Sequence, residues 1–189
     1  MLRIITGTAK GKKLLTLEGD ATRPTSDRIK GAIFSSIQFD IEGRRVLDLF
    51  AGSGQLGLEA MSRGAESVTF VDMEREAMDI VKKNAKSTGF FESCRYSVSD
   101  YRNFIRKASG RDTYDLVFID PPYSMQCAAE ALIRIQEASL LSDGAIAVLE
   151  SGEEAVDIPR LAALGFECIK STAYGKKTAV NVLVWHKKD

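Results

Sequence analysis

The feature that most constrains this fold is an apolar run that leads into a glycine-rich loop and then into a helical pattern, within residues 46–58. Val46–Phe50 is typical of a buried strand, and Gly52, Gly54 and Gly57 follow it with the spacing G-x-G-x-x-G. Glycines let the backbone approach a ligand closely, and a helix N-terminus offers unpaired N–H groups. This order predicts a nucleotide-type ligand in an α/β fold. The alternative is a tight strand–helix turn that binds nothing.

Strand and helix patterns keep alternating after this loop, which predicts a mostly parallel seven-stranded sheet with helices on both faces. A turn centred on Gly175 makes the last strand antiparallel. We expect one domain over residues 1–189, with an extension at 1–40 and a core at 41–189. The strands are expected at 45–50, 67–72, 93–98, 114–119, 144–150, 165–172 and 179–186, and the helices at 55–63, 74–87, 100–107, 125–138 and 159–164. The extension is expected to form a small hairpin from residues 2–6 and 12–17, followed by a helix over Ser26–Ile37.

Three acidic residues stand at predicted strand ends. Asp72 follows the second strand and suits the hydroxyls of a ribose. Asp48, inside the end of the first strand, would be costly beside a pyrophosphate but can pair with the ammonium of a methionine group. That difference favours S-adenosylmethionine over NAD. Asp100 suits an adenine amino group or a helix N-cap, and the two roles are compatible. The predicted cofactor residues are Asp48, Phe50, Ala51, Gly52, Ser53, Gly54, Gly57, Asp72, Met73 and Asp100.

The strand predicted at 114–119 ends in Asp120-Pro121-Pro122-Tyr123. Proline has no N–H and a fixed φ, so the turn is rigid and presents carbonyls as acceptors. Asp120 adds a carboxylate, and Tyr123 adds a flat ring. This combination is typical of a site that holds the exocyclic amine of a nucleobase and stacks on its face. The alternative is a Pro-rich turn with Tyr123 packed on the core.

Several further segments match one family, and the match runs over nearly the whole chain. They are Arg3–Gly7, Lys10–Leu14, Arg23–Lys30, Leu47–Ala60, Asp120–Tyr123 and Tyr174–Thr178. On these residues the chain resembles the bacterial methyltransferases that modify the N2 amine of one guanine in 16S ribosomal RNA. Many amino-methyltransferases share the glycine loop and the Asp-Pro-Pro-Tyr turn, whereas Arg23–Lys30 is more specific. One position departs: Gly31 stands where the family usually has Glu.

The resemblance implies a Rossmann-like class I methyltransferase that uses S-adenosylmethionine. Its substrate would be 16S ribosomal RNA or a small-subunit particle, with Asp120, Pro121, Pro122 and Tyr123 as catalytic residues. The N-terminal extension would bind RNA. The residues expected to contact RNA or to close over the target base are Lys10, Lys12, Lys13, Arg23 and Arg28.

Composition agrees with these expectations. The chain has no net charge, yet residues 1–30 hold seven basic and three acidic residues, which suits contact with an RNA backbone. A solvated charged face is the alternative. Three cysteines without paired spacing and a single histidine predict neither a disulfide framework nor a metal site. With no apolar run of membrane length and no secretory core, we expect a cytoplasmic protein without a membrane partner. We also expect a monomer.

Three other functions compete with this interpretation. An NAD-dependent oxidoreductase would share the loop and Asp72 but would leave Asp48 and the Asp-Pro-Pro-Tyr turn unexplained. A non-catalytic RNA-binding module would not need an intact cofactor loop. An adenine-N6 methyltransferase acting on DNA or RNA could use the same turn, and only the resemblance selects guanine.

Overall fold

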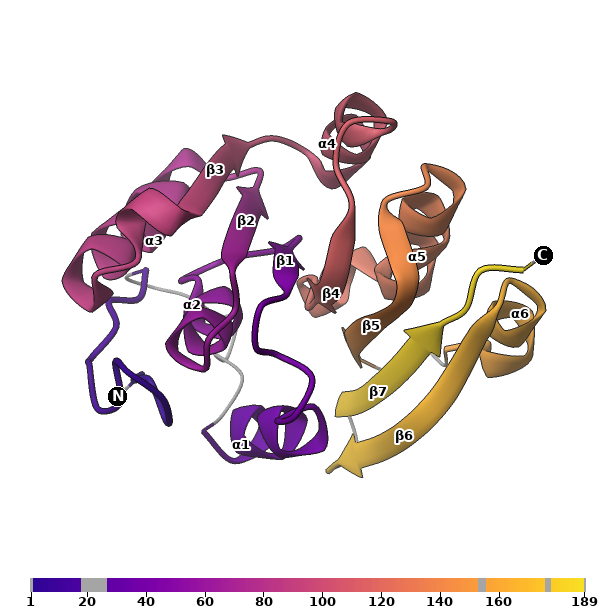
Figure 1. The fold of residues 1–189 in the computed structure, drawn as a ribbon, viewed down its shortest axis with the longest axis horizontal. Helices are drawn as coiled ribbons and strands as arrows, with labels where there is room; N and C mark the ends of the chain where they lie inside the picture. The colour runs from indigo at the N-terminus through magenta and orange to yellow at the C-terminus, as the bar shows by residue number, and fades with distance from the viewer. Residues whose placement is uncertain (1, 18–26, 153–155, 176–177, 189) are drawn as a thin grey trace.

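The computed structural model describes residues 2–17, 27–152, 156–175 and 178–188, and Figure 1 shows its ribbon. One seven-stranded sheet runs through the molecule in the order β3-β2-β1-β4-β5-β7-β6. The strands are β1 Arg45–Asp48, β2 Ser67–Asp72, β3 Cys94–Val98, β4 Tyr114–Ile119, β5 Leu141–Ser151, β6 Phe166–Tyr174 and β7 Thr178–Trp185. The helices are α1 Asp27–Ser36, α2 Gln55–Ser62, α3 Arg75–Thr88, α4 Tyr101–Ala108, α5 Ala128–Glu137 and α6 Ile158–Ala163, with short 3-10 turns η1 Phe91–Ser93 and η2 Tyr123–Met125.

The pairing of the strands confirms the predicted fold class. Strands β1 to β5 pair in parallel, because each crossover between them carries a helix that packs back on the sheet. Strand β7 pairs antiparallel with both β5 and β6. The hairpin turn at Gly175 has φ +69°, a conformation in which glycine is favoured.

Successive side chains of each strand point to opposite faces of the sheet, so the strands contribute to two apolar layers, one on each face. Val46 and Phe118 belong to the layer covered by α1, α2 and α3, whereas Leu47 and Val117 belong to the layer covered by α4, α5 and α6. Phe34 of α1 packs on Phe118 with ring centroids 5.6 Å apart. Figure 1 shows the helices on both sides of the twisted sheet.

The N-terminal hairpin expected from residues 2–6 and 12–17 pairs through one antiparallel bridge, between Arg3 and Lys13. Backbone hydrogen bonds flank the bridge, from the N–H of Leu14 to Leu2 and from the N–H of Ile4 to Lys12, each at 2.9 Å. The small hairpin is therefore confirmed, but its paired segments are shorter than predicted. The physical reason is that side chains of α2 and α3 take the neighbouring backbone groups, such as the N–H of Ile5, which donates to Glu59. The helix predicted from Ser26 begins at Asp27 in the described residues, and Ser26 itself lies outside them.

Within the described ranges, none of the helices combines the length and apolarity that a bilayer crossing requires. The same residues contain no group of three or more His, Cys, Asp or Glu side chains arranged to hold a metal ion.

Candidate active site

The carboxyl ends of β1, β2 and β4 lie side by side at one edge of the sheet, where the strand order reverses between β1 and β4. Past the strand ends, the N–H of Leu49 donates to the carbonyl of Phe118 at 3.1 Å, and the N–H of Ala51 donates to Val71 at 2.9 Å. The glycine loop and the Asp-Pro-Pro-Tyr turn therefore emerge at the same edge. In open α/β sheets this is where ligands bind.

The three glycines of the loop have separate structural roles. Gly52 and Gly54 have φ values of +52° and +77°, a region that other residues rarely adopt. Gly57, in the first turn of α2, lies against the sheet, and a Cβ there would be 2.4 Å from the ring of Phe70. A Cβ at Gly52 would meet no atom within 4 Å, so the loop is open on that side.

Asp48 is buried beneath the loop, with 2% of its surface exposed. Its Oδ2 accepts from the backbone N–H of Gly57 at 2.9 Å, so the carboxylate fixes the start of α2. Burial raises the pKa of Asp48 to about 7, the Gly57 bond opposes this, and the charge of Asp72 adds to it. No cationic side chain contributes to this shift. Pairing of the buried carboxyl with the ammonium of a methionine group stays a prediction.

Asp72 and Asp100 also hold the backbone around the site. Asp72 accepts from the N–H of Gly52 at 2.8 Å through Oδ2 and from Glu74 at 2.9 Å through Oδ1. It is only half-buried, and each carboxylate oxygen has a second acceptor position for a ribose hydroxyl. Asp100 caps α4 by accepting from Arg102 at 2.9 Å. The N-cap role is thus present, and an adenine contact stays a prediction.

The other predicted cofactor residues lie along the same loop and strand ends. Phe50 is half-buried and packs on the ring of Tyr101 with centroids 5.3 Å apart. Met73 has 58% of its surface exposed just beyond Asp72, and its contact with a cofactor stays a prediction. The carbonyl of Ser53 accepts from the side chain of Asn84 at 2.9 Å. Asn84 was not predicted, although a lone amide among apolar helix positions is a signal for it.

The Asp-Pro-Pro-Tyr turn leaves β4 at the neighbouring position. Asp120 is half-buried, Pro121 is buried and Pro122 is exposed. The carbonyl of Pro122 accepts from the N–H of Met125 at 2.9 Å. This bond uses one of the two acceptor positions of that carbonyl, so a contact with a base amine stays a prediction for both prolines. Tyr123 begins η2, and its side chain lies outside the described part of the structure.

The basic N-terminal residues are displayed on a turn that the core holds firmly. Lys10, Lys12 and Lys13 are exposed. Ser62 of α2 fixes the turn, since its Oγ accepts from the N–H of Ala9 at 2.9 Å and donates to a carbonyl of the same turn. Arg28 is exposed in the first turn of α1, and Arg23 lies outside the described residues. The structure thus places the three lysines together and leaves Arg23 undescribed.

A buried ion pair anchors α1 and was not predicted from the sequence. The side chains of Lys30 and Glu59 are both 0% exposed, and their charged atoms lie 3.7 Å apart. Lys30 donates to the carbonyl of Arg3 at 2.5 Å, and Glu59 accepts from the N–H of Ile5 at 2.7 Å. Desolvation lowers the pKa of Lys30, and Glu59 opposes that shift. The adjacent Gly31 has open space at its Cβ position.

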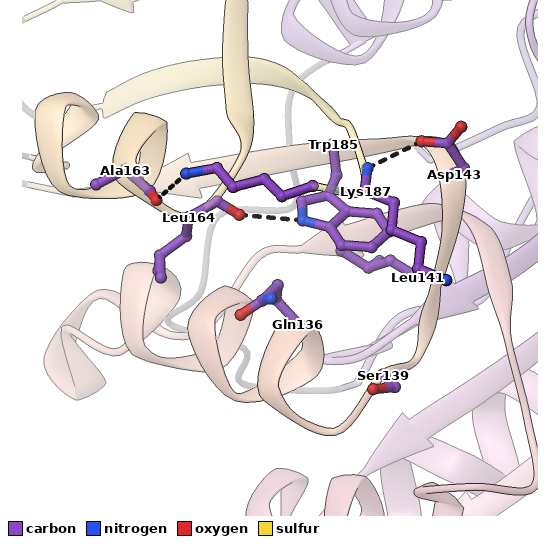
Figure 2. Close-up of a pocket in the computed structure, with 9 residues that line it drawn as sticks. Gln136, Ser139, Leu141, Asp143, Ala163, Leu164, Trp185 and Lys187 are labelled. Atoms are coloured by element: carbon purple, nitrogen blue, oxygen red, sulfur yellow. Dashed lines mark hydrogen bonds between the residues drawn. The ribbon is translucent and has the colours of Figure 1, made fainter.

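A groove of about 690 Å³ lies at the other edge of the sheet (Figure 2). Leu141, at the amino end of β5, and Trp185, at the end of antiparallel β7, line it. Hydrogen bonds join some of the groups that line it: the indole N–H of Trp185 donates to the carbonyl of Leu164 at 3.2 Å, and the N–H of Lys187 donates to Asp143 at 2.9 Å. The groove is therefore separate from the edge that carries the predicted site residues.

Known proteins resemble this chain over most of its length. It is 32% identical to "Ribosomal RNA small subunit methyltransferase D" of Haemophilus influenzae over 81% of this chain and 80% of that protein. It is 33% identical to the protein of the same name from Escherichia coli, over 81% of this chain and 76% of that protein. The solved structure of the yhhF protein of Escherichia coli superposes with a TM-score of 0.85 at 28% identity, covering 99% of both chains.

Fold, site geometry and relatives agree on the class of enzyme. The chain is an S-adenosylmethionine-dependent methyltransferase with a Rossmann-like fold. A family model described as "Conserved hypothetical protein 95" matches residues 2–182. The chain belongs to that family.

Proposed function

We propose that this methyltransferase modifies the exocyclic N2 amine of a guanine in small-subunit (16S) ribosomal RNA. The observation that carries the proposal is the position of the Asp120–Tyr123 turn, which leaves β4 beside the glycine loop on β1. A base amine held by that turn would face a methyl group held by the loop. The printed names of the relatives support ribosomal RNA of the small subunit as the substrate.

The residues of the turn supply positioning and electrostatics. The bound S-adenosylmethionine supplies an electrophilic methyl on sulfur. Asp120 accepts from the amine and, with the carbonyl of Pro121, orients its lone pair toward the methyl carbon. A guanine amine is a poor nucleophile because its lone pair is delocalised into the ring, so this orientation contributes much of the rate. With the cofactor bound, transfer to the amine would form an N–C bond, release S-adenosylhomocysteine as the C–S bond breaks, and release one proton to solvent.

The remaining predicted site residues would bind either the cofactor or the RNA. Asp48 would pair with the methionine ammonium and Asp72 with the ribose hydroxyls, while Asp100 and Met73 border the adenine. Tyr123 would stack on a base that has been splayed out of the RNA. We assign RNA contact to the extension at residues 1–40, chiefly to Lys10, Lys12 and Lys13, with Arg23 and Arg28 near the target base. A cytoplasmic monomer acting on an RNA or a small-subunit particle fits these roles.

Nucleoside analysis tests the proposal. Small-subunit particles lacking the modification would be incubated with labelled S-adenosylmethionine and digested to nucleosides. The expected product is N2-methylguanosine at one site. Recovery of N6-methyladenosine would instead establish the adenine alternative, and label in neither base would refute nucleobase methylation. Running free 16S RNA beside the particles identifies which form is the substrate.

A further inference from the structure

Asn84 of α3 connects two parts of the molecule that are far apart in the sequence. Its side chain is buried, with 1% of its surface exposed. Its Oδ1 accepts from the N–H of Leu15 at 2.8 Å. Its Nδ2 donates to the carbonyl of Leu15 at 3.0 Å and to the carbonyl of Ser53 at 2.9 Å. One amide thus holds the N-terminal segment and the cofactor loop at the same time.

The cost of burying an amide makes this arrangement specific. Asn is a poor helix former, and burying its side chain without partners is unfavourable. Here the carbonyl oxygen is used and both N–H bonds of the amide have acceptors. If Leu15 moved away, the Asn84 side chain would lose two of its three hydrogen bonds, and its orientation toward Ser53 would no longer be fixed.

The loop needs such a tether because its own sequence is permissive. Ser53 stands between Gly52 and Gly54, both with positive φ, and glycines have little intrinsic preference for one conformation. The N–H of Gly52 is held by Asp72. The carbonyl of Ser53 is held by Asn84, so this bond determines how the middle of the loop is presented to a ligand. When a loop is already ordered before the ligand binds, less of the binding free energy is offset by the entropy cost of ordering it.

We propose that Asn84 is a positioning residue that couples docking of the N-terminal segment to cofactor affinity. Lys13 lies two residues before Leu15, on the segment to which we assign RNA contact. Insofar as the proposed function is right, RNA held by this segment and cofactor held by the loop then strengthen each other's binding. Such coupling is reciprocal for binding free energies.

The matched pair Leu15→Pro and Leu15→Ala isolates the contact. Proline removes the N–H that donates to Asn84, whereas alanine shortens an exposed side chain and keeps both backbone groups. Leu15→Pro is expected to weaken S-adenosylmethionine binding by about threefold to tenfold in calorimetry, and Leu15→Ala to leave it unchanged. Equal affinity in both variants would overturn the proposal.

A double-variant cycle tests whether the effect passes through Asn84. Asn84→Ala should weaken cofactor binding by itself, and adding Leu15→Pro should weaken it no further. Additive losses would mean that the segment acts by another route and would refute the role of Asn84. Thermal unfolding of each variant identifies any that fails to fold.

Hydrogen exchange of the wild-type protein tests the coupling between Leu15 and the cofactor loop without any substitution. Saturating S-adenosylhomocysteine should slow exchange of the Leu15 amide by about threefold to tenfold, by reciprocity. The Lys187 amide, which donates to Asp143 beside the distant groove of Figure 2, is the control and should change less. An unchanged Leu15 amide would contradict the coupling.

Measuring RNA binding separates the coupling through Asn84 from the proposed function. S-adenosylhomocysteine should raise the affinity of the wild-type protein for 16S RNA by the same threefold to tenfold, and it should not raise the affinity of Leu15→Pro. If no guanine is methylated but the calorimetry and exchange results hold, the proposed function fails and the positioning role of Asn84 stands. If guanine is methylated and Leu15→Pro binds cofactor normally, the proposed function stands and the positioning role of Asn84 fails.

Discussion

The carboxylate of Asp48 accepts from the backbone N–H of Gly57 at 2.9 Å, so a buried acid at the end of β1 holds the first turn of α2. This single contact joins the strand, the glycine loop and the helix. It also fixes, beneath the glycine loop, a carboxyl whose pKa burial has raised to about 7 and to which we assign the methionine ammonium.

Cofactor affinity should therefore depend on pH through Asp48. The ammonium prefers the ionised carboxylate, so affinity for S-adenosylmethionine should rise by up to about tenfold per pH unit below 7 and then level off. Because the pKa of Asp48 in the folded protein lies above its ordinary 3.8, its contribution to stability without cofactor falls as the pH rises from 3.8 to about 7. Calorimetry and thermal unfolding between pH 5.5 and 7.5 measure both effects. Asp48→Asn should remove both, and an unchanged pH profile in that variant would contradict the assignment.

Gly57→Ala should destabilise the protein and abolish tight cofactor binding, because the new Cβ would be 2.4 Å from the ring of Phe70. Overpacking of this kind costs about 1–3 kcal/mol. Gly31→Ala is the matched control, since no atom lies within 4 Å of its Cβ position, and it should stabilise α1 by up to about 1 kcal/mol. Urea titration of both variants decides this, and similar unfolding free energies would count against the close packing of α2 on β2.

Asp72→Ala should weaken S-adenosylmethionine binding by about 1–3 kcal/mol, because it leaves the ribose hydroxyls and the N–H of Gly52 without an acceptor. Asp72→Asn retains an acceptor for the N–H of Gly52, so its affinity for S-adenosylmethionine should fall by less. Asp79→Ala, which removes an exposed carboxylate of α3, is the charge control. Titration calorimetry measures all three, and full affinity in Asp72→Ala would exclude the ribose role.

Replacing Lys10, Lys12 and Lys13 together with alanine should weaken RNA binding and leave cofactor binding intact. Their side chains are exposed, so the fold does not depend on them. The slope of log affinity against log salt should become shallower by about 2–3, the value for three phosphate contacts.

The control for this variant removes equal charge elsewhere, at Arg106, Lys107 and Arg111, which are exposed on α4 and the loop that follows it. That variant should keep the wild-type slope. Identical slopes for wild type and the N-terminal variant would mean that the three lysines are only solvated, and the RNA surface would then be sought elsewhere.

The sequence predicted the order of strands and helices and the acids at the strand ends, because periodicity and glycine spacing are local signals. The functions of those acids were harder to predict. Asp72 and Asp100 bond to backbone N–H groups, and a sequence pattern cannot separate that structural role from the predicted contact with a cofactor. The bridge made by Asn84 and the Lys30–Glu59 pair join positions far apart in the chain, so only the folded structure reveals them.

The role of Asp120 in methyl transfer to a guanine is tested most directly by comparing wild type with Asp120→Ala. Single-turnover transfer to small-subunit particles would be measured for both, and the product would be identified by nucleoside analysis. Wild type should give N2-methylguanosine. Asp120→Ala should bind S-adenosylmethionine with near-normal affinity in calorimetry, yet transfer the methyl group about 100-fold more slowly or worse, since its carboxylate orients the amine. Near-normal transfer by Asp120→Ala would contradict the role of its carboxylate, and methylation of a base other than guanine would contradict the proposed substrate.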